Sequence, residues 1–148
     1  MLDDVDRRIL RQFQAAPEMS VAELAERCSL TTASCWRRLE KLESSGVILG
    51  HEAVVDWQAF GVGVEVSLRI TVDKTQSSAS FLLTRDVPEV LEVQTFLGRV
   101  DVRLLVIARD MAHYQDVYRS QILSLPHIAD IEALMHIARL KSDEVLPI

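Results

Sequence analysis

The sequence predicts an α+β protein in which an N-terminal winged helix-turn-helix precedes a ferredoxin-like βαββαβ domain. Three observations predict this class. Residues 1–50 contain three short amphipathic helical patterns with capping residues. Residues 51–63 end in FGVG, whose glycines are typical of a connector between domains. Residues 64–148 alternate between strand and helix patterns in the order of a split βαβ fold, and we expect them to form the second domain.

Three helices are expected before residue 50. The first begins at Asp3 or Asp4, whose carboxylates suit a helix N-terminus, and stops at Pro17. The second begins at Ser20, which has capping-box spacing to the glutamate three residues later. A turn of a few residues leads to a third helix capped by Thr31. The stretches VIL and HEAVVDW that follow it predict short strands, which would form the wing.

The third helix combines an apolar face with a basic one. Cys35, Leu39 and Leu42 recur at helical spacing, so they form the side that faces the core. The opposite side is polar and basic, and it consists of Ser34, Arg37 and Lys41 with Arg38 beside them.

This helix is the expected recognition helix, because a tight turn joins it to a capped helix. We expect Thr32, Ser34 and Arg37 to approach base edges, whereas Arg38 and Lys41 are better placed for phosphates. Trp36 lies at the edge of the apolar stripe; packing against the first helix is favoured there over a DNA contact. A solvated surface helix is the alternative for the whole segment. The predicted DNA-binding residues are Thr31, Thr32, Ser34, Trp36, Arg37, Arg38 and Lys41.

The second domain is expected to form a four-stranded antiparallel sheet with two helices on one face. The other face must be covered, and a second copy of the domain is the simplest candidate. Strands are predicted at 64–72, 89–97, 101–109 and 128–140, and helices at 74–88 and 111–126.

Charge and composition exclude several classes of protein. The net charge of −6 argues mildly against nucleic acid, but residues 51–148 carry most of the acidity. Cys28, Cys35 and the scattered histidines lack metal-site spacing, so we expect no metal and no cofactor. No catalytic motif is present, and an enzyme is not expected. No signal sequence and no apolar run of about 20 residues is found, which predicts a soluble cytoplasmic protein without a membrane segment.

The order of motifs resembles the Lrp/AsnC, or feast/famine, family of prokaryotic transcription regulators. The similar stretches are LDDVDRRIL, VAELAERCSLTTASCWRRLEKLESSGVILG, VQTFLGRVDVRLLV and ILSLPHIADIEALMHIARLK. The resemblance implies that the helix-turn-helix binds double-stranded DNA and that the C-terminal domains pair through their sheets. It also implies homodimers that assemble further, commonly into octamers, with small effectors bound between dimers.

The LGRVD loop is similar to the loop that lines the family's amino-acid effector pocket. From the residues alone, a simple β-hairpin turn at Gly98 remains open. The resemblance implies that Asp101 contacts the effector's ammonium or orders the loop, and that a neighbouring subunit supplies part of the final strand. Val100 stands where relatives usually carry an aromatic residue. The implied effector residues are Leu97, Gly98, Arg99, Val100, Asp101, Leu134, Met135 and His136.

The predicted function is that of a sequence-specific DNA-binding transcriptional regulator that responds to an amino acid or related small-molecule effector. The main alternative is a small-molecule-binding sensor module that acts through protein contacts, which the negative charge favours. A small enzyme on the ferredoxin-like scaffold is the third possibility.

Overall fold

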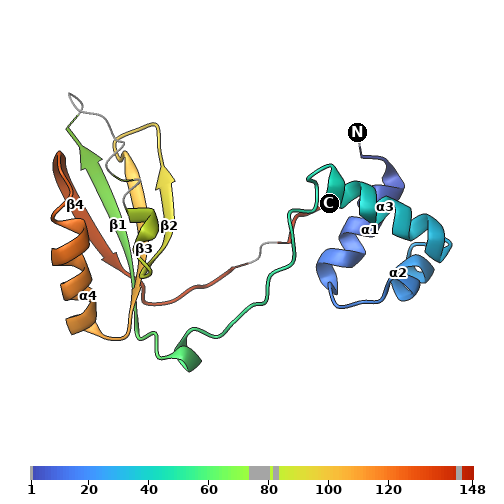
Figure 1. Ribbon diagram of the computed structural model, residues 1–148, viewed down its shortest axis with the longest axis horizontal. Helices are drawn as coiled ribbons and strands as arrows, with labels where there is room; N and C mark the ends of the chain where they lie inside the picture. The colour runs from blue at the N-terminus through green and yellow to red at the C-terminus, as the bar shows by residue number, and fades with distance from the viewer. Residues whose placement is uncertain (1, 74–80, 82–83, 143–144) are drawn as a thin grey trace. The chain divides into compact units, whose positions relative to one another are not determined.

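The computed structural model describes residues 2–73, 81, 84–142 and 145–148. The chain forms two compact units (Figure 1). The helical unit contains residues 1–54 together with 141–148, and the sheet unit contains residues 55–140. None of the helices in these described ranges is both long and apolar enough to cross a membrane.

Three helices, α1 (Asp4–Ala15), α2 (Val21–Arg27) and α3 (Thr32–Ser44), form most of the helical unit. Their predicted N-caps are confirmed, because the side chains of Asp3, Ser20 and Thr31 each accept a backbone N–H from the third residue along. At α1 the cap is reciprocal, because the Asp6 carboxylate accepts the Asp3 N–H at 3.2 Å.

The core of the helical unit is small and closely packed. Ile9, Leu24 and Ala25 are fully buried, together with Cys28 and Cys35, which are free thiols. Burial raises the pKa of both cysteine thiols, so both are held in the uncharged form. The interpretation of these cysteines as small buried core residues is confirmed.

The predicted wing strands are absent from the described segment 46–57. The backbone after α3 serves the helix end instead: Gly46 has φ +74°, and the N–H groups of Val47 and Ile48 both donate to the Leu42 carbonyl. Further along, Leu49 is 95% exposed and Val54 100% exposed. A strand needs a partner ladder, and no described segment of the chain pairs with these residues.

The sheet unit confirms the predicted ferredoxin-like order. Its strands are β1 (Val64–Val72), β2 (Val90–Thr95), β3 (Val102–Ala108) and β4 (Ile128–Met135). All pairs are antiparallel and the spatial order is β2-β3-β1-β4 (Figure 1). Helix α4 (Met111–Val117) continues as a π-helical turn, Tyr118–Ile122, and covers one face of the sheet.

Alternate residues of the two central strands make the core under α4. In β1 these are Val66, Leu68, Ile70 and Val72, and they pack with the matching positions of β3 and with Tyr114, Val117 and Ile122. The predicted helix over 74–88 falls mostly on residues 74–80, 82 and 83, which lie outside the described part. Within the remainder of that range, residues 84–86 form a 3-10 turn, and Phe81 and Thr84 are buried.

The last strand is shorter than predicted. β4 ends at Met135, and only the N–H of His136, which donates to the Glu65 carbonyl at 2.9 Å, extends the ladder. Continuing the same register would place Ile137 opposite Val64, the first residue of β1, so residues beyond 137 have no β1 residue to pair with. Consequently Ile137 and Leu140 are 99% and 97% exposed.

The final residues pack with the helical unit, although we expected them within the second domain. The side chain of Ile148 contacts the helical core, and its carbonyl accepts from Arg11 Nε at 2.5 Å. The Leu146 N–H donates to Gln14 Oε1 at 2.8 Å. Helix α1 is therefore held by residues from both ends of the described chain.

Candidate functional site

Helix α3 presents a polar and basic surface on the side away from its core. Cys35, Leu39 and Leu42 are buried as predicted, and Thr32, Arg37 and Lys41 are exposed. Arg37 Nε reaches the Ala33 carbonyl of its own helix at 3.4 Å. Neither Arg37 nor Lys41 forms an ion pair with an acid in the described ranges, so both cations are available to a ligand.

Trp36 is 59% exposed, so the favoured interpretation, packing against the first helix, is wrong. Position 36 lies about 100° around the helix from Cys35, which takes the indole off the stripe that α1 and α2 cover. An exposed indole beside two arginines can contact sugar or base surfaces as well as water.

Arg38 is engaged elsewhere in this structure. Its Nη1 lies 2.8 Å from Asp3 Oδ2 and 2.6 Å from Asp6 Oδ1. These contacts join the start of α1 to the middle of α3, and they offset the charge that we expected to face phosphates. The remaining two predicted residues have local roles as well: Thr31 caps α3, and Ser34 is half-buried and supplies the capped N–H.

The N-terminal cap predicts a pH dependence of folding stability. The Asp6 N–H and then the Arg38 guanidinium hold the pKa of Asp3 below its ordinary value of 3.8. A carboxyl with a lowered folded-state pKa stabilises the fold above its unfolded pKa, and the contribution is lost as pH falls through the folded value. The difference in unfolding free energy between the wild type and Asp3→Asn should therefore shrink as urea titrations move from about pH 6 to about pH 3. Asp4→Asn is the control, and a difference that stays constant with pH contradicts the assignment.

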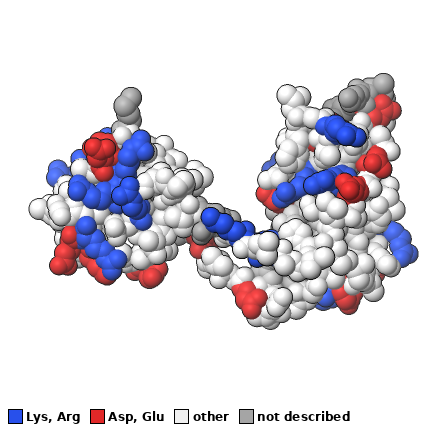
Figure 2. All heavy atoms as spheres, turned by 180° about the vertical axis from the view of Figure 1, so that it is seen from behind, with Lys and Arg blue, Asp and Glu red and all other residues white. Residues whose placement is uncertain are grey.

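Charge is distributed differently over the surfaces of the two units. Figure 2 shows Lys and Arg side chains gathered on the visible face of the helical unit, with acids mainly at its rim. On the sheet unit, acidic and basic side chains alternate over the same view. A basic face on a protein of net charge −6 concentrates attraction for an anion on one unit.

The predicted effector loop joins β2 to β3 and is held by Asp101. The Asp101 carboxylate accepts the Val72 N–H at 2.8 Å, and the Asp101 N–H donates to the Ile70 carbonyl at 3.1 Å. The Arg99 carbonyl accepts from the Thr71 hydroxyl at 3.3 Å. These contacts hold the loop against the end of β1, and the choice between the two roles expected of Asp101 stays a prediction. Leu97, Gly98 and Arg99 at the tip are exposed, whereas Val100 is half-buried.

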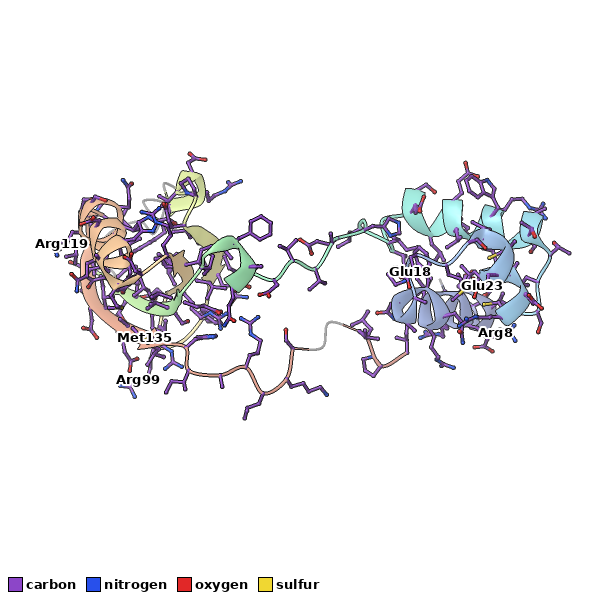
Figure 3. The ribbon with its side chains drawn as sticks, turned by 90° about the horizontal axis from the view of Figure 1, so that it is seen from below. Arg8, Glu18, Glu23, Arg99, Arg119 and Met135 are labelled. Atoms are coloured by element: carbon purple, nitrogen blue, oxygen red, sulfur yellow. The ribbon has the colours of Figure 1, made fainter. Side chains whose placement is uncertain are left out.

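The two groups of predicted effector residues lie at opposite ends of the sheet in one chain. The loop contacts Val72, at the end of β1, whereas Met135 pairs with Val66, and six residues of an extended strand span about 20 Å. Figure 1 shows the β2–β3 turn at the top of the sheet and the end of β4 at the bottom. Figure 3 looks along the strands, so Arg99 and Met135 overlap there only in projection. One site containing both groups requires two chains.

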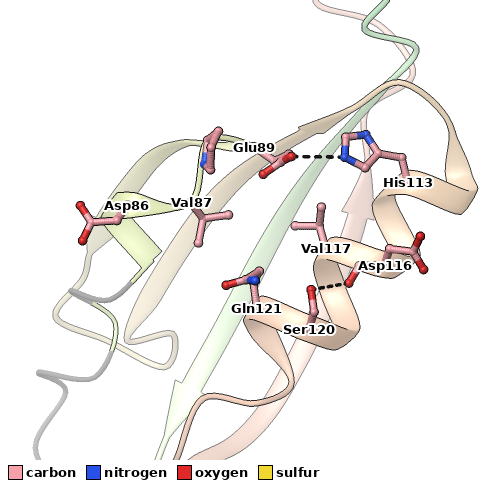
Figure 4. Close-up of a pocket in the computed structure, with 9 residues that line it drawn as sticks. Asp86, Val87, Glu89, His113, Asp116, Val117, Ser120 and Gln121 are labelled. Atoms are coloured by element: carbon pink, nitrogen blue, oxygen red, sulfur yellow. Dashed lines mark hydrogen bonds and ion pairs between the residues drawn. The ribbon is translucent and has the colours of Figure 1, made fainter.

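The structure also contains a hollow that the sequence did not single out. It measures about 360 Å³ and lies between α4 and the segment that leads into β2 (Figure 4). Across it, His113 Nε2 is 3.2 Å from Glu89 Oε1; along the helix, the Ser120 hydroxyl donates to the Asp116 carbonyl at 2.7 Å. None of the predicted site residues lines it. The spacing of His113 and Asp116 on a helix was the one available signal, and it is too common to identify a site.

The described residues contain no group of three or more His, Cys, Asp or Glu side chains that could hold a metal ion. The hollow beside α4 therefore offers a histidine and carboxylates without the geometry of a metal centre.

Comparison with known proteins finds a family for each of the two parts of the chain. Residues 2–48 match a family described as winged helix-turn-helix DNA-binding, and residues 64–146 match the Lrp/AsnC ligand binding domain. The DNA-binding transcriptional activator DecR of Escherichia coli (strain K12) is 32% identical over 154 aligned positions, which cover 100% of this chain and 99% of DecR.

Two crystal structures of similar proteins cover the whole architecture. An AsnC family transcriptional regulator from Agrobacterium tumefaciens is 31% identical, with a TM-score of 0.87, and the match covers 99% of this chain and 97% of that one. A transcriptional regulator from Neisseria meningitidis, solved as a complex with L-methionine, is 25% identical with a TM-score of 0.89 and the same coverage. The helix-turn-helix, the antiparallel sheet and these matches together show that the chain belongs to the Lrp/AsnC family of transcriptional regulators.

Proposed function

We propose that the chain regulates transcription by placing α3 in the major groove of double-stranded DNA. The exposed cations of α3 carry this proposal, because Arg37 and Lys41 project from a helix whose other side is locked into the core. Arg37, Thr32 and Ser34 are assigned to base edges, and Lys41 to phosphates. Trp36 joins this surface. Arg38 is assigned to orienting α3 through its contacts with Asp3 and Asp6.

The experiment is a selection of duplexes from a random-sequence library by the full chain, followed by titration of the enriched site and of a scrambled site. A regulator that reads sequence binds the enriched site far more tightly than the scrambled one, at the same salt concentration. Equal binding to both would remove sequence-specific recognition from the proposal. Absence of any binding would favour a sensor that acts through protein contacts.

The sheet unit is proposed to bind an amino acid or a related small effector at the LGRVD loop. The Neisseria relative was solved with L-methionine, and the Asp101 contacts supply an ordered loop here. Within one chain this loop lies at the opposite end of the sheet from Leu134, Met135 and His136. The complete site is therefore proposed to form between subunits. No catalytic activity and no cofactor are part of the proposal, and the protein is expected to act in the cytoplasm.

Assembly is proposed to begin with a homodimer through the face of the sheet opposite α4. On that face Arg69 of β1 stands directly opposite Arg103 of β3, and Glu132 and Glu92 lie 3.6 and 3.1 Å from them respectively. These four side chains are too polar to form a hydrophobic core, but they offer both positive and negative charges to a second copy of the domain. Dimers are proposed to associate further, with the octamer as the expected size, and light scattering tests this.

Asp101 allows the two roles of its carboxylate to be separated. Asp101→Asn keeps an oxygen that can accept the Val72 N–H but removes the charge, whereas Asp101→Ala removes both. We expect Asp101→Ala to lose about 1 kcal/mol of stability and the effector response together. If the residue only orders the loop, Asp101→Asn should retain effector binding by calorimetry. Loss of binding in Asp101→Asn with normal stability would instead indicate direct contact with the ammonium.

A further inference from the structure

Two segments of the chain join the helical unit to the sheet unit. The chain crosses between Val54 and Val55, and it returns between Leu140 and Lys141. Any influence that travels along the chain from one unit to the other must pass through these two segments. The contacts that hold both of them on the sheet unit are therefore places where such an influence can be controlled.

One arginine contacts both segments. Arg139 stands just before the return crossing, and its guanidinium carbon lies 5.7 Å from the ring centroid of Trp57, just after the first crossing. Its Nη2 donates to Glu65 Oε1 at 2.6 Å. A guanidinium can make both contacts at once, because its planar face stacks on an aromatic ring while its edge donates hydrogen bonds.

The same carboxylate oxygen also faces His136, the last of the predicted effector residues. His136 Nδ1 lies 3.2 Å from Glu65 Oε1, and the His136 N–H donates to the Glu65 carbonyl at 2.9 Å. The Glu65 side chain is 20% exposed, against 38% for His136 and 43% for Arg139. Glu65 is thus the least exposed of the three side chains, and it contacts both the end of β4 and the return segment.

The root of the first connector is well anchored, so Trp57 has a defined place. The Asp56 carboxylate accepts the Gln58 N–H, the Val62 N–H donates to the Trp57 carbonyl, and the Gly63 N–H donates to the Ala108 carbonyl. A Cβ at Gly63 would lie 2.5 Å from the carbonyl oxygen of Arg109, the residue after β3, so only glycine allows the backbone to approach this closely. Displacement of Arg139 therefore exposes the Trp57 ring while the backbone around Trp57 stays in place.

We propose that Glu65, His136, Arg139 and Trp57 form a clasp that transmits ligand occupancy at the end of β4 to the connectors of the DNA-binding unit. The relay rests on the effector function proposed above. An amino acid placed against His136 brings an ammonium that competes for Glu65 and a carboxylate that competes for Arg139. Either contact releases Arg139 from Trp57 and detaches the return segment from the root of the first connector. Such a ligand shifts the clasp because it binds the open and closed arrangements differently.

The clasp itself is tested without a ligand. The chain has two tryptophans, so Trp36→Phe leaves Trp57 as the sole reporter. In that background Arg139→Ala should make Trp57 roughly twofold more accessible to acrylamide quenching, because the guanidinium lies over the ring. Arg119→Ala is the matched control, since Arg119 extends from the π-helical turn after α4 and donates an exposed hydrogen bond to Gln115 (Figure 3). Arg139→Lys is the second variant, for the case in which Arg139→Ala does not fold. It keeps the charge without the planar face and should also raise quenching. Unchanged quenching in both would overturn the clasp.

The relay is tested by titrating each standard amino acid, beginning with L-methionine, while following heat and Trp57 emission. A ligand that binds by calorimetry should shift Trp57 emission in Trp36→Phe and produce no shift once Arg139→Ala is added, although heat is still released. In proteins that keep Trp36, Arg139→Ala should retain affinity for the enriched duplex but lose its response to that ligand. Binding heat without any Trp57 change in Trp36→Phe overturns the relay. Absence of heat from every amino acid overturns the effector function itself and the relay with it, and the quenching experiment still decides the clasp.

Discussion

Arg37→Ala should lower affinity for the selected duplex by about 1–3 kcal/mol, roughly fivefold to 150-fold, and relax the preference at one or two base pairs. The guanidinium is exposed on α3, forms no ion pair in the described ranges and makes one long contact to its own helix. Nothing within the protein replaces it in the groove. Titrations of wild type and variant on the enriched duplex and on its single-base variants measure the effect.

Two other substitutions separate base reading from general attraction. Lys41→Ala should weaken all duplexes alike and reduce the slope of log affinity against log salt by about one. Arg27→Ala, which removes a cation of α2 already paired with Glu23 at 2.9 Å, should have little effect. An Arg37→Ala protein that binds the enriched duplex as tightly as wild type would exclude α3 as the reading helix.

Leu24→Ala should destabilise the helical unit by about 2–5 kcal/mol, because the side chain is fully buried and its removal leaves a cavity. Leu24 packs with Ile9 and Cys35 in the small cluster that supports α3. A loss of this size is a large part of the stability of an ordinary domain. DNA binding should fall with the folded fraction of this unit. Native-state hydrogen exchange should show faster opening of α1, α2 and α3.

The matched control is Leu49→Ala, in which the deleted side chain is 95% exposed, and it should change stability by less than about 0.5 kcal/mol. Amides of β1 and β3 should keep their protection in Leu24→Ala, because the core of the sheet unit is separate. Equal loss of protection in both units would show that they unfold together.

Local signals in the sequence were sufficient for the three helices of the helical unit, for the presence of the four strands of the sheet and for the core side of α3. Thr31 and Ser20 have capping chemistry that depends only on residues three positions away, and both caps are present. The alternation in β1 and β3 likewise identifies which residues face α4.

The features that the sequence did not predict depend on contacts between residues far apart in the chain. Arg38 reaches Asp3 and Asp6, which are 35 and 32 positions away, so its engagement could not be predicted from the pattern of α3. The end of β4 depends on where β1 begins. The contact between Glu65 and Arg139 spans 74 positions, and no periodicity indicates it. Predicted site residues on α3 and in the LGRVD loop came from motif and resemblance, and their roles stay predictions until the binding experiments are done.

The contacts of Leu146 and Ile148 with α1 have a consequence for biosynthesis. A ribosome makes these two residues after the three helices and after the whole sheet unit, so the helical unit gains these contacts only once the sheet unit has been synthesised. Nascent chains should therefore carry a helical unit that is only partly consolidated. Messages cut short after β4 would yield a protein with its DNA-binding part permanently in that immature state.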